Sequence, residues 1–214
     1  MAKTLYSLML SEDVVREVDK LAHRMGTNRS SLINSVLAEY VGFTTPERRI
    51  SQILTEMERL LSPVTDFVPF LAPNSTSLSL KSALEYKYRP TVKYEVQLYK
   101  GAGAAIGELS VVFRTQSAAL LSAMTEFFRL WKRVEDAILA PAGVRIEYAL
   151  FDGRFTRTLA CPARETDSET LANDLSAYVR LFDRCMKSFL AGNCSEADVR
   201  EAYLRHLDET RTLL

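Results

Sequence analysis

The sequence predicts an α+β protein. A short strand and two helices come first, followed by a larger domain of two β-hairpin–helix units whose strands form an antiparallel sheet with the helices on one face. Residues 4–10 can alternate as a strand, and two stretches with helical apolar spacing follow. Further along, residues 92–100 with 108–114, and residues 144–151 with 154–161, alternate as paired strands, and each pair precedes a long amphipathic stretch. Strands and helices grouped in this way are typical of the α+β class.

The first element is the predicted strand, whose side chains divide between two faces. One face carries Thr4, Tyr6, Leu8 and Leu10. The other face carries Lys3, Leu5, Ser7 and Met9. Successive side chains of a strand point to opposite sides, so one set can pack against helices while the other faces outward.

Two helices are predicted after this strand. Ser11 is a good N-cap, and Glu12 and Asp13 place negative charge in the first turn, where the helix dipole favours it. Gly26 ends the first helix, and Thr27 or Asn28 caps the second. The apolar stripe of the first helix is Val14, Val15, Val18, Leu21, Ala22 and Met25. The stripe of the second is Leu32, Ile33, Val36, Leu37, Tyr40 and Val41.

About forty residues are too few to close a core without a metal, a disulfide or a partner. A lone strand also leaves both of its edges unpaired. A second copy of the chain resolves both problems, because two strands can pair antiparallel around a two-fold axis over four helices. The outer face would then be a two-stranded ribbon, which fits the major groove of DNA.

The residues that form this pattern carry a resemblance to a known family. Leu8-Met9-Leu10-Ser11-Glu12-Asp13-Val14 and the run from Leu21 through Gly26-Thr27-Asn28-Arg29-Ser30-Ser31 to Ile33 resemble the ribbon-helix-helix (CopG/Arc/MetJ-type) DNA-binding proteins. The resemblance covers residues 3–42 and implies a homodimer bound to double-stranded DNA. The base-facing ribbon residues implied by position are Lys3, Leu5, Ser7 and Met9. The implied phosphate clamp is Asn28, Arg29 and Ser30, at the start of the second helix.

The ribbon departs from the family in chemistry. Leu5 and Met9 can touch thymine methyl groups but cannot hydrogen-bond to bases. The basic and acidic side chains of residues 1–45 also cancel, whereas DNA-binding modules are usually basic. A unit that only dimerises, with its ribbon covered by another element, is therefore the alternative interpretation.

The next predicted elements connect this unit to the larger domain. Thr45 and Pro46 predict the start of a helix with an apolar stripe from Ile50 to Leu61. Residues 64–71 fit either a short helix or an extended segment, and residues 78–88 fit either a strand or a helix. The predicted domains are residues 1–43, a dimerisation and DNA-binding unit; residues 44–72, a connecting helix; and residues 78–214, an α+β domain of unknown role.

The larger domain is predicted from two hairpins and three helices. Asp152-Gly153 predicts a type I′ turn between residues 144–151 and 154–161. Long helices are expected at about residues 116–140 and, capped by Thr166 or Asp167, up to about residue 191. Ser195 caps a last helix up to about residue 212. The two hairpin–helix units can be an internal repeat, with four strands in one sheet.

Basic and aromatic side chains alternate around the first of these hairpins. They form a possible secondary basic patch of Lys87, Arg89, Lys93 and Lys100. Arg145, Arg154 and Arg157 would extend this patch if they share its face. A nucleic-acid surface has this composition, and so does an ordinary solvated strand face.

Other classes of protein lack support in the sequence. The 214 residues carry no net formal charge, and no apolar run reaches the ~20 residues that cross a membrane. Cys161, Cys185 and Cys194 are odd in number and widely spaced, which predicts free thiols and a cytoplasmic location. His23 and His206 are expected on the surface. We find no catalytic constellation, metal site or cofactor motif, so we expect no enzyme.

The leading hypothesis is a dimeric, sequence-specific DNA-binding protein of the transcriptional regulator type, such as a repressor. Its C-terminal domain would bind an effector or a partner, or add oligomerisation. The alternative is a protein-interaction or scaffold module that dimerises through its N-terminal unit, as an antitoxin-like protein or a plasmid partition or conjugation accessory protein does. The third and weakest hypothesis is an enzyme.

Overall fold

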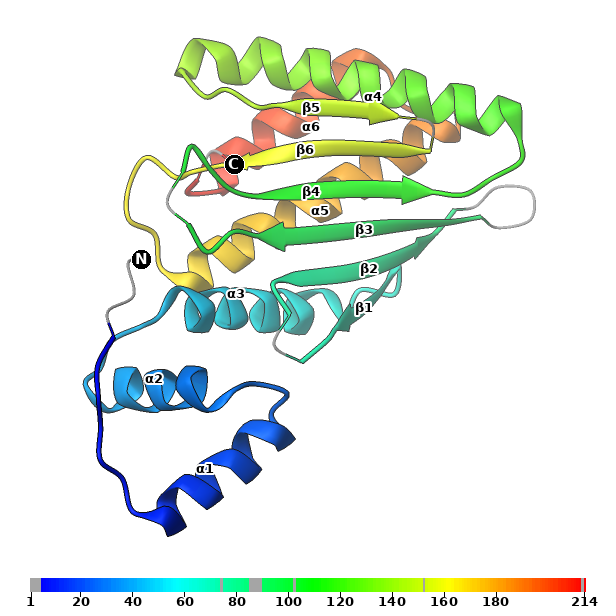
Figure 1. The fold of residues 1–214 in the computed structure, drawn as a ribbon. Coiled ribbons are helices and arrows are strands. Elements are labelled where there is room, and N and C mark those ends of the chain that lie inside the picture. Colours follow the sequence, from blue (N-terminus) through cyan, green and yellow to red (C-terminus); the bar gives the residue numbers. More distant parts are fainter. Residues whose placement is uncertain (1–4, 74, 85–89, 102, 152, 213) are drawn as a thin grey trace.

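The structure is a computed structural model that describes residues 5–73, 75–84, 90–101, 103–151, 153–212 and 214. Within these residues the protein is a mixed α+β fold with six α-helices, one short 3-10 helix and one antiparallel sheet of six strands. The chain begins with two helices, and all the strands come later (Figure 1).

The two N-terminal helices begin and end near the predicted residues. α1 is Glu12–Arg24 and α2 is Arg29–Tyr40. Gly26 takes a positive φ of 62° between them, where the backbone carries the left-handed turn that favours glycine. The Asn28 side chain accepts a hydrogen bond from the Ser31 amide at 2.9 Å, so Asn28 caps α2.

The predicted strand at residues 4–10 is not present in the single chain. Residues 5–11 have no regular secondary structure, and Thr4 lies outside the described residues. A strand is defined by its ladder of hydrogen bonds, which a lone segment cannot make. The ribbon-helix-helix arrangement is therefore not confirmed.

The third helix, α3 (Pro46–Leu61), belongs to the packing of the larger domain. Thr45 caps it and Pro46 occupies its first turn, as predicted. Ile50, Leu54 and Met57 are buried in one hydrophobic core with the sheet and the later helices. α3 therefore does more than connect two parts of the chain, because it supplies one wall of this core.

All neighbouring strands of the sheet are antiparallel, in the order β1-β2-β3-β4-β6-β5. The strands are β1 (Phe67–Leu71), β2 (Ser77–Ala83), β3 (Thr91–Leu98), β4 (Ala105–Phe113), β5 (Tyr148–Phe151) and β6 (Arg154–Ala160). Each of the two segments that the sequence left open contributes a strand, β1 within residues 64–71 and β2 up to Ala83 in the other, where residues 85–88 lie outside the described residues. The sheet therefore has six strands where four were predicted. β5 is shorter than the predicted residues 144–151 because its pairing with β6 begins at Tyr148.

Three helices follow the hairpins. They are α4 (Ala118–Leu139), α5 (Ser168–Leu190) and α6 (Glu196–Glu209), with the 3-10 helix η1 (Ala140–Ala142) after α4. Asp167 caps α5, and Ser195 forms a capping box with Asp198 at the start of α6. The predicted end of the last helix, at about residue 212, lies beyond its observed end.

One face of the sheet is covered by the helical layer (Figure 1). Alternate side chains of β2, β3, β4 and β6 point into the core, and they pack with residues of α3, α4, α5 and α6. The helices therefore lie on a single face of the sheet, as predicted. No helix in the described part of the chain has both the length and the apolar character that a membrane crossing requires.

Candidate functional site

The N-terminal unit, residues 5–43, exposes an unusual amount of apolar surface. Thirteen of the nineteen large apolar side chains that are exposed among the described residues lie in this short part of the chain. Ala22 and Leu32 are the buried apolar side chains of the unit. Figure 1 shows α1 and α2 away from the sheet, so the larger domain does not cover this surface. The single chain leaves the apolar stripes of α1 and α2 largely unpacked.

The segment that precedes α1 exposes both of its predicted faces. Of the implied base-facing residues, Leu5 and Met9 are fully exposed and Ser7 is exposed as well, while Lys3 lies outside the described residues. Tyr6, on the face predicted to pack on helices, is also 81% exposed. Within the described part of one chain, this segment has neither a partner strand nor a helix beneath it.

The implied phosphate clamp lies together at the start of α2. Asn28, Arg29 and Ser30 are consecutive and exposed. The amides of the first turn of a helix have no partner within that helix, and they point along its axis with the positive end of the dipole. This geometry suits an anion.

Arg29 is already engaged by an acidic side chain of α1. Its guanidinium donates two hydrogen bonds to the Asp19 carboxylate, at 2.7 and 2.5 Å. The hydrogen bond from Arg29 lowers the pKa of Asp19, and the same contact raises the pKa of Arg29. Arg29 thus ties α2 to α1, and a phosphate at this site would have to share it with Asp19.

No protein-family model, no curated protein and no solved structure gives a significant match to this chain. The roles of its residues therefore have to be argued from its own geometry.

The predicted secondary basic patch is not brought together by the described residues. Lys87 and Arg89 lie outside them. Lys93 is on β3 and pairs with Glu95 at 3.2 Å, whereas Lys100 follows that strand and pairs with Glu47 at 3.5 Å. Arg157 cannot extend the patch, because its side chain is fully buried on the helix-covered face.

Arg157 forms a buried ion pair with Glu135 of α4. Two guanidinium nitrogens lie 2.9 and 3.1 Å from the Glu135 carboxylate, and both side chains are 0% exposed. The hydroxyls of Tyr148, Tyr178 and Tyr203 also donate to this carboxylate, at 2.9, 2.8 and 3.0 Å. Burial disfavours the charged form of Arg157, but the Glu135 charge outweighs it and raises the pKa of Arg157.

This cluster joins five elements of the larger domain: α4, β5, β6, α5 and α6. Arg157 also donates to the Leu214 carbonyl oxygen, whereas its Nη1 has no hydrogen-bond partner among the described residues. The three tyrosines have raised pKa values chiefly because of burial. We assign it a structural role, since largely buried polar networks of this kind fix the packing of elements.

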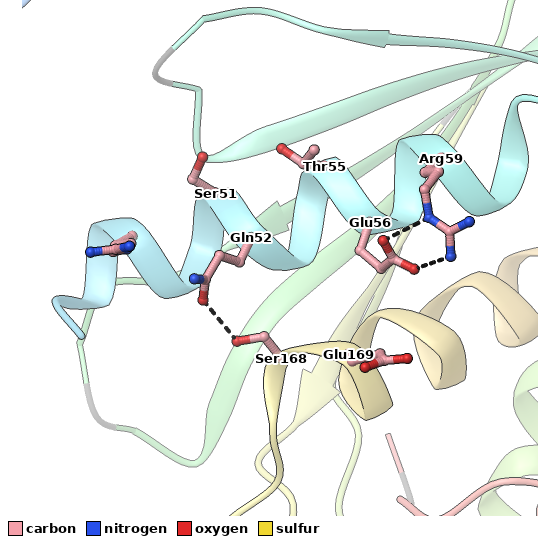
Figure 2. Close-up of a pocket in the computed structure, with 8 residues that line it drawn as sticks. Ser51, Gln52, Thr55, Glu56, Arg59, Ser168 and Glu169 are labelled. Carbon is pink, nitrogen blue, oxygen red and sulfur yellow. Dashed lines mark hydrogen bonds and ion pairs between the residues drawn. The ribbon is translucent and has the colours of Figure 1, made fainter. Parts of the chain in front are cut away.

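A hollow of about 580 Å³ lies between α3 and the start of α5 (Figure 2). Polar residues line it, and both of its cations are paired: Arg59 donates to Glu56 at 2.9 and 2.5 Å, and Arg48 lies 3.3 Å from Glu39 of α2. The Ser168 hydroxyl donates to the Gln52 side chain at 3.4 Å across one end. With both of its cations already paired, the hollow offers no distinctive chemistry.

The histidines and cysteines differ in their surroundings. His23 is exposed, as expected, but His206 is buried, 8% exposed, so the prediction of a surface position was wrong. It packs between Tyr178 and Tyr203, and burial lowers its pKa.

All three cysteines are free, and burial raises the pKa of Cys185 to about 11. Among the described residues no group of three or more His, Cys, Asp or Glu could hold a metal ion.

Sequence reasoning missed the Glu135–Arg157 pair, although the signal was present. Glu135 lies four residues after Trp131 and seven after Phe128, which places it within the apolar stripe of α4. Arg157 alternates with Phe155 and Leu159, the core-facing residues of its strand. Opposite charges at two core-facing positions predict a buried ion pair between these side chains.

Proposed function

We propose that the protein is a dimeric, sequence-specific DNA-binding protein of the transcriptional regulator type. The N-terminal units of two chains pair through residues 4–10 and through the apolar stripes of α1 and α2, in the ribbon-helix-helix manner. The larger domain then carries effector binding, partner binding or further oligomerisation.

The observation that carries this proposal is the concentration of exposed apolar side chains in residues 5–43. A unit this short cannot bury its own stripes, and surface of this kind marks a site of association. A second copy of the same unit would cover this apolar surface and would also pair with the lone extended segment, because two-fold symmetry places each segment beside an identical partner. The paired segments then form the ribbon that a major groove accepts.

Ser30→Glu tests the DNA contact without disturbing the helix. A carboxylate in the first turn of α2 is favoured by the helix dipole, but it repels a phosphate at the clamp. We expect Ser30→Glu to keep the dimer and to lose retention of duplex DNA that has been selected from random sequences with the wild type. Gel retardation and sedimentation velocity measure the two properties.

Ser51→Glu is the matched control, since Ser51 is an exposed serine on α3 and the change in charge is the same. It should bind the selected duplex as the wild type does. Equal DNA binding by Ser30→Glu and wild type would refute the proposed clamp, and selection that enriches no sequence would refute the function.

Charge favours a second candidate function, a protein-interaction module of the scaffold or antitoxin-like type. The described part of the N-terminal unit holds four basic and five acidic side chains, which is unfavourable for a polyanion. Under this alternative the wild type dimerises through the same stripes but shows no salt-dependent binding to any duplex.

A further inference from the structure

The face of the sheet opposite the helices is open. Its described side chains are exposed or half-buried, apart from Ser110 and Ala160. The Ser110 hydroxyl accepts a hydrogen bond from Arg154 at 3.0 Å. The helices that contribute to the core all pack on the other face. This open face spans all six strands of the sheet (Figure 1).

The strand register aligns basic side chains in one row across this face. From one edge of the sheet to the other, the row is Val68, Lys81, Lys93, Val112, Arg154 and Phe151. Each residue is the register partner of the next. At about 4.8 Å between neighbouring strands, the three cations span about 14 Å.

The positive charge of this row is only partly compensated by the protein. Lys81 and Lys93 are directly opposed, an arrangement that like charges disfavour. Lys93 has Glu95 as a partner at 3.2 Å, whereas neither Lys81 nor Arg154 forms an ion pair with a described residue. The other acidic side chain of this face, Glu108, lies toward the opposite end of the strands and accepts a hydrogen bond from Tyr99. The row therefore attracts an extended anion.

Two aromatic side chains stand on the same face near its edges. Phe151 ends the basic row and is 65% exposed, and Phe70 of β1 is 68% exposed one row away. Burying rings of this size is strongly favourable, so their exposure on a sheet edge indicates a partner that covers them. Bases stack on such rings, and basic side chains between the rings can follow a phosphate backbone.

We propose that the open face of the sheet binds single-stranded nucleic acid. Lys81, Lys93 and Arg154 contact successive phosphates, and Phe70 and Phe151 stack on unpaired bases. A duplex satisfies the cations but offers the rings no free base faces. An acidic peptide likewise supplies charge without planar groups for the rings. This site is separate from the N-terminal unit and does not depend on it.

The test uses the full chain and a fluorescent DNA single strand of about 20 nucleotides, longer than the usual footprint of one such module. Fluorescence anisotropy is followed from about 50 to about 200 mM salt. We expect the triple variant Lys81→Gln, Lys93→Gln, Arg154→Gln to bind about tenfold or more weakly at low salt, with the slope of log K against log salt reduced by about 2. Phe70→Ser and Phe151→Ser should each weaken binding about tenfold.

Three exposed arginines on helices supply the matched control. Arg180→Gln, Arg184→Gln and Arg200→Gln together change the net charge equally but lie on α5 and α6. This control should keep the affinity and slope of the wild type. Ser30→Glu should also keep single-strand binding, which separates this proposal from that of the N-terminal unit.

Several outcomes would overturn the proposal. They are no single-strand binding by the wild type, equal losses in the sheet and helix triple variants, or competition by polyglutamate as effective as by the unlabelled strand. Stronger binding to a duplex of random sequence than to the single strand, with no effect of Phe70→Ser and Phe151→Ser, would overturn it as well. Thermal melts of each variant verify that the larger domain is folded.

Discussion

At the scale of single residues, the Glu135–Arg157 pair is the most demanding feature of the core. Both side chains are 0% exposed, so each charge depends on the other for its solvation. We expect Arg157→Leu to lower the free energy of unfolding by about 3–5 kcal/mol, because it leaves the Glu135 carboxylate buried with hydroxyl partners alone. Urea denaturation at neutral pH measures this loss.

The double variant Glu135→Leu, Arg157→Leu separates the pair from the packing around it. Replacing both charges removes the unpaired carboxylate, so the double variant should be more stable than Arg157→Leu. A single variant that costs less than about 1 kcal/mol would show that the tyrosine hydroxyls alone satisfy Glu135.

His206 predicts a dependence of stability on pH. Burial lowers its pKa in the folded protein below the ordinary value of 6.5, although Asp174 and Glu209 oppose this shift. Below about pH 6.5 the unfolded chain then binds more protons than the folded one, so stability falls as the pH is lowered. We expect the melting temperature to drop between about pH 7 and about pH 5.

His206→Gln removes the titrating group while keeping a polar side chain. Its melting temperature should vary less over the same interval than that of the wild type. Identical profiles for the two proteins would show that His206 titrates alike in both states. Carboxylates with lowered pKa values, such as Asp167 and Asp198, take up protons only at lower pH. They therefore do not contribute to the change in stability between about pH 7 and about pH 5.

At the scale of elements, the apolar stripe of α2 predicts the behaviour of the N-terminal unit. Leu37 is 51% exposed in the single chain, so a polar replacement costs the monomer little. In the proposed dimer it would become buried, where a charge is unfavourable. We expect Leu37→Glu to convert the protein to a monomer in sedimentation velocity and to abolish duplex binding.

Leu204→Glu provides the comparison, because Leu204 is a similarly exposed leucine on α6, 42% exposed. It should leave the dimer intact. Sedimentation of the wild type as a monomer at micromolar concentration would contradict the proposed pairing.

Helices were predictable from the sequence because their signals are local. Asn28, Thr45 and Ser195 each cap the helix that follows, through contacts within three residues. The sequence did not predict β1 and β2 as strands. Leu78 and Leu80 alternate, but the alternating stretch is too short to distinguish a strand from a helix. Their place at the edge of the sheet depends on pairing between Ser77–Ala83 and Thr91–Leu98, which no local pattern encodes.

The candidate sites show the same difference between local signals, which the sequence contains, and contacts between distant segments, which it does not show. The residues of the proposed clamp, Asn28 to Ser30, could be located from a cap and a turn, and both of these signals are local. In the proposed dimer, the pairing of the segment that holds Leu5 and Met9 depends on a second chain, so the pattern within one sequence does not determine it. The basic row could not be predicted from the sequence, for two reasons. Lys81 lies on a strand that the sequence did not predict, and only the strand register aligns Lys81, Lys93 and Arg154.

At the scale of the whole molecule, the hydrophobic core begins at α3. The buried cluster runs from Ile50 to Leu214 and includes no residue of α1 or α2. The ion pair from α2 to α3, between Glu39 and Arg48 at 3.3 Å, is exposed and contributes little. The N-terminal unit and the larger domain therefore depend on different packing.

Deletion of residues 1–44 tests this division, because the fragment 45–214 keeps Thr45, the cap of α3. We expect the fragment to retain the melting transition of the larger domain within a few degrees, since no core contact is removed. It should lose duplex binding but keep single-strand binding. The shorter fragment 62–214 lacks Ile53, Leu54 and Met57 of α3, each at most 3% exposed, and should not fold cooperatively. Loss of the transition in fragment 45–214 would show instead that the N-terminal unit stabilises the larger domain directly.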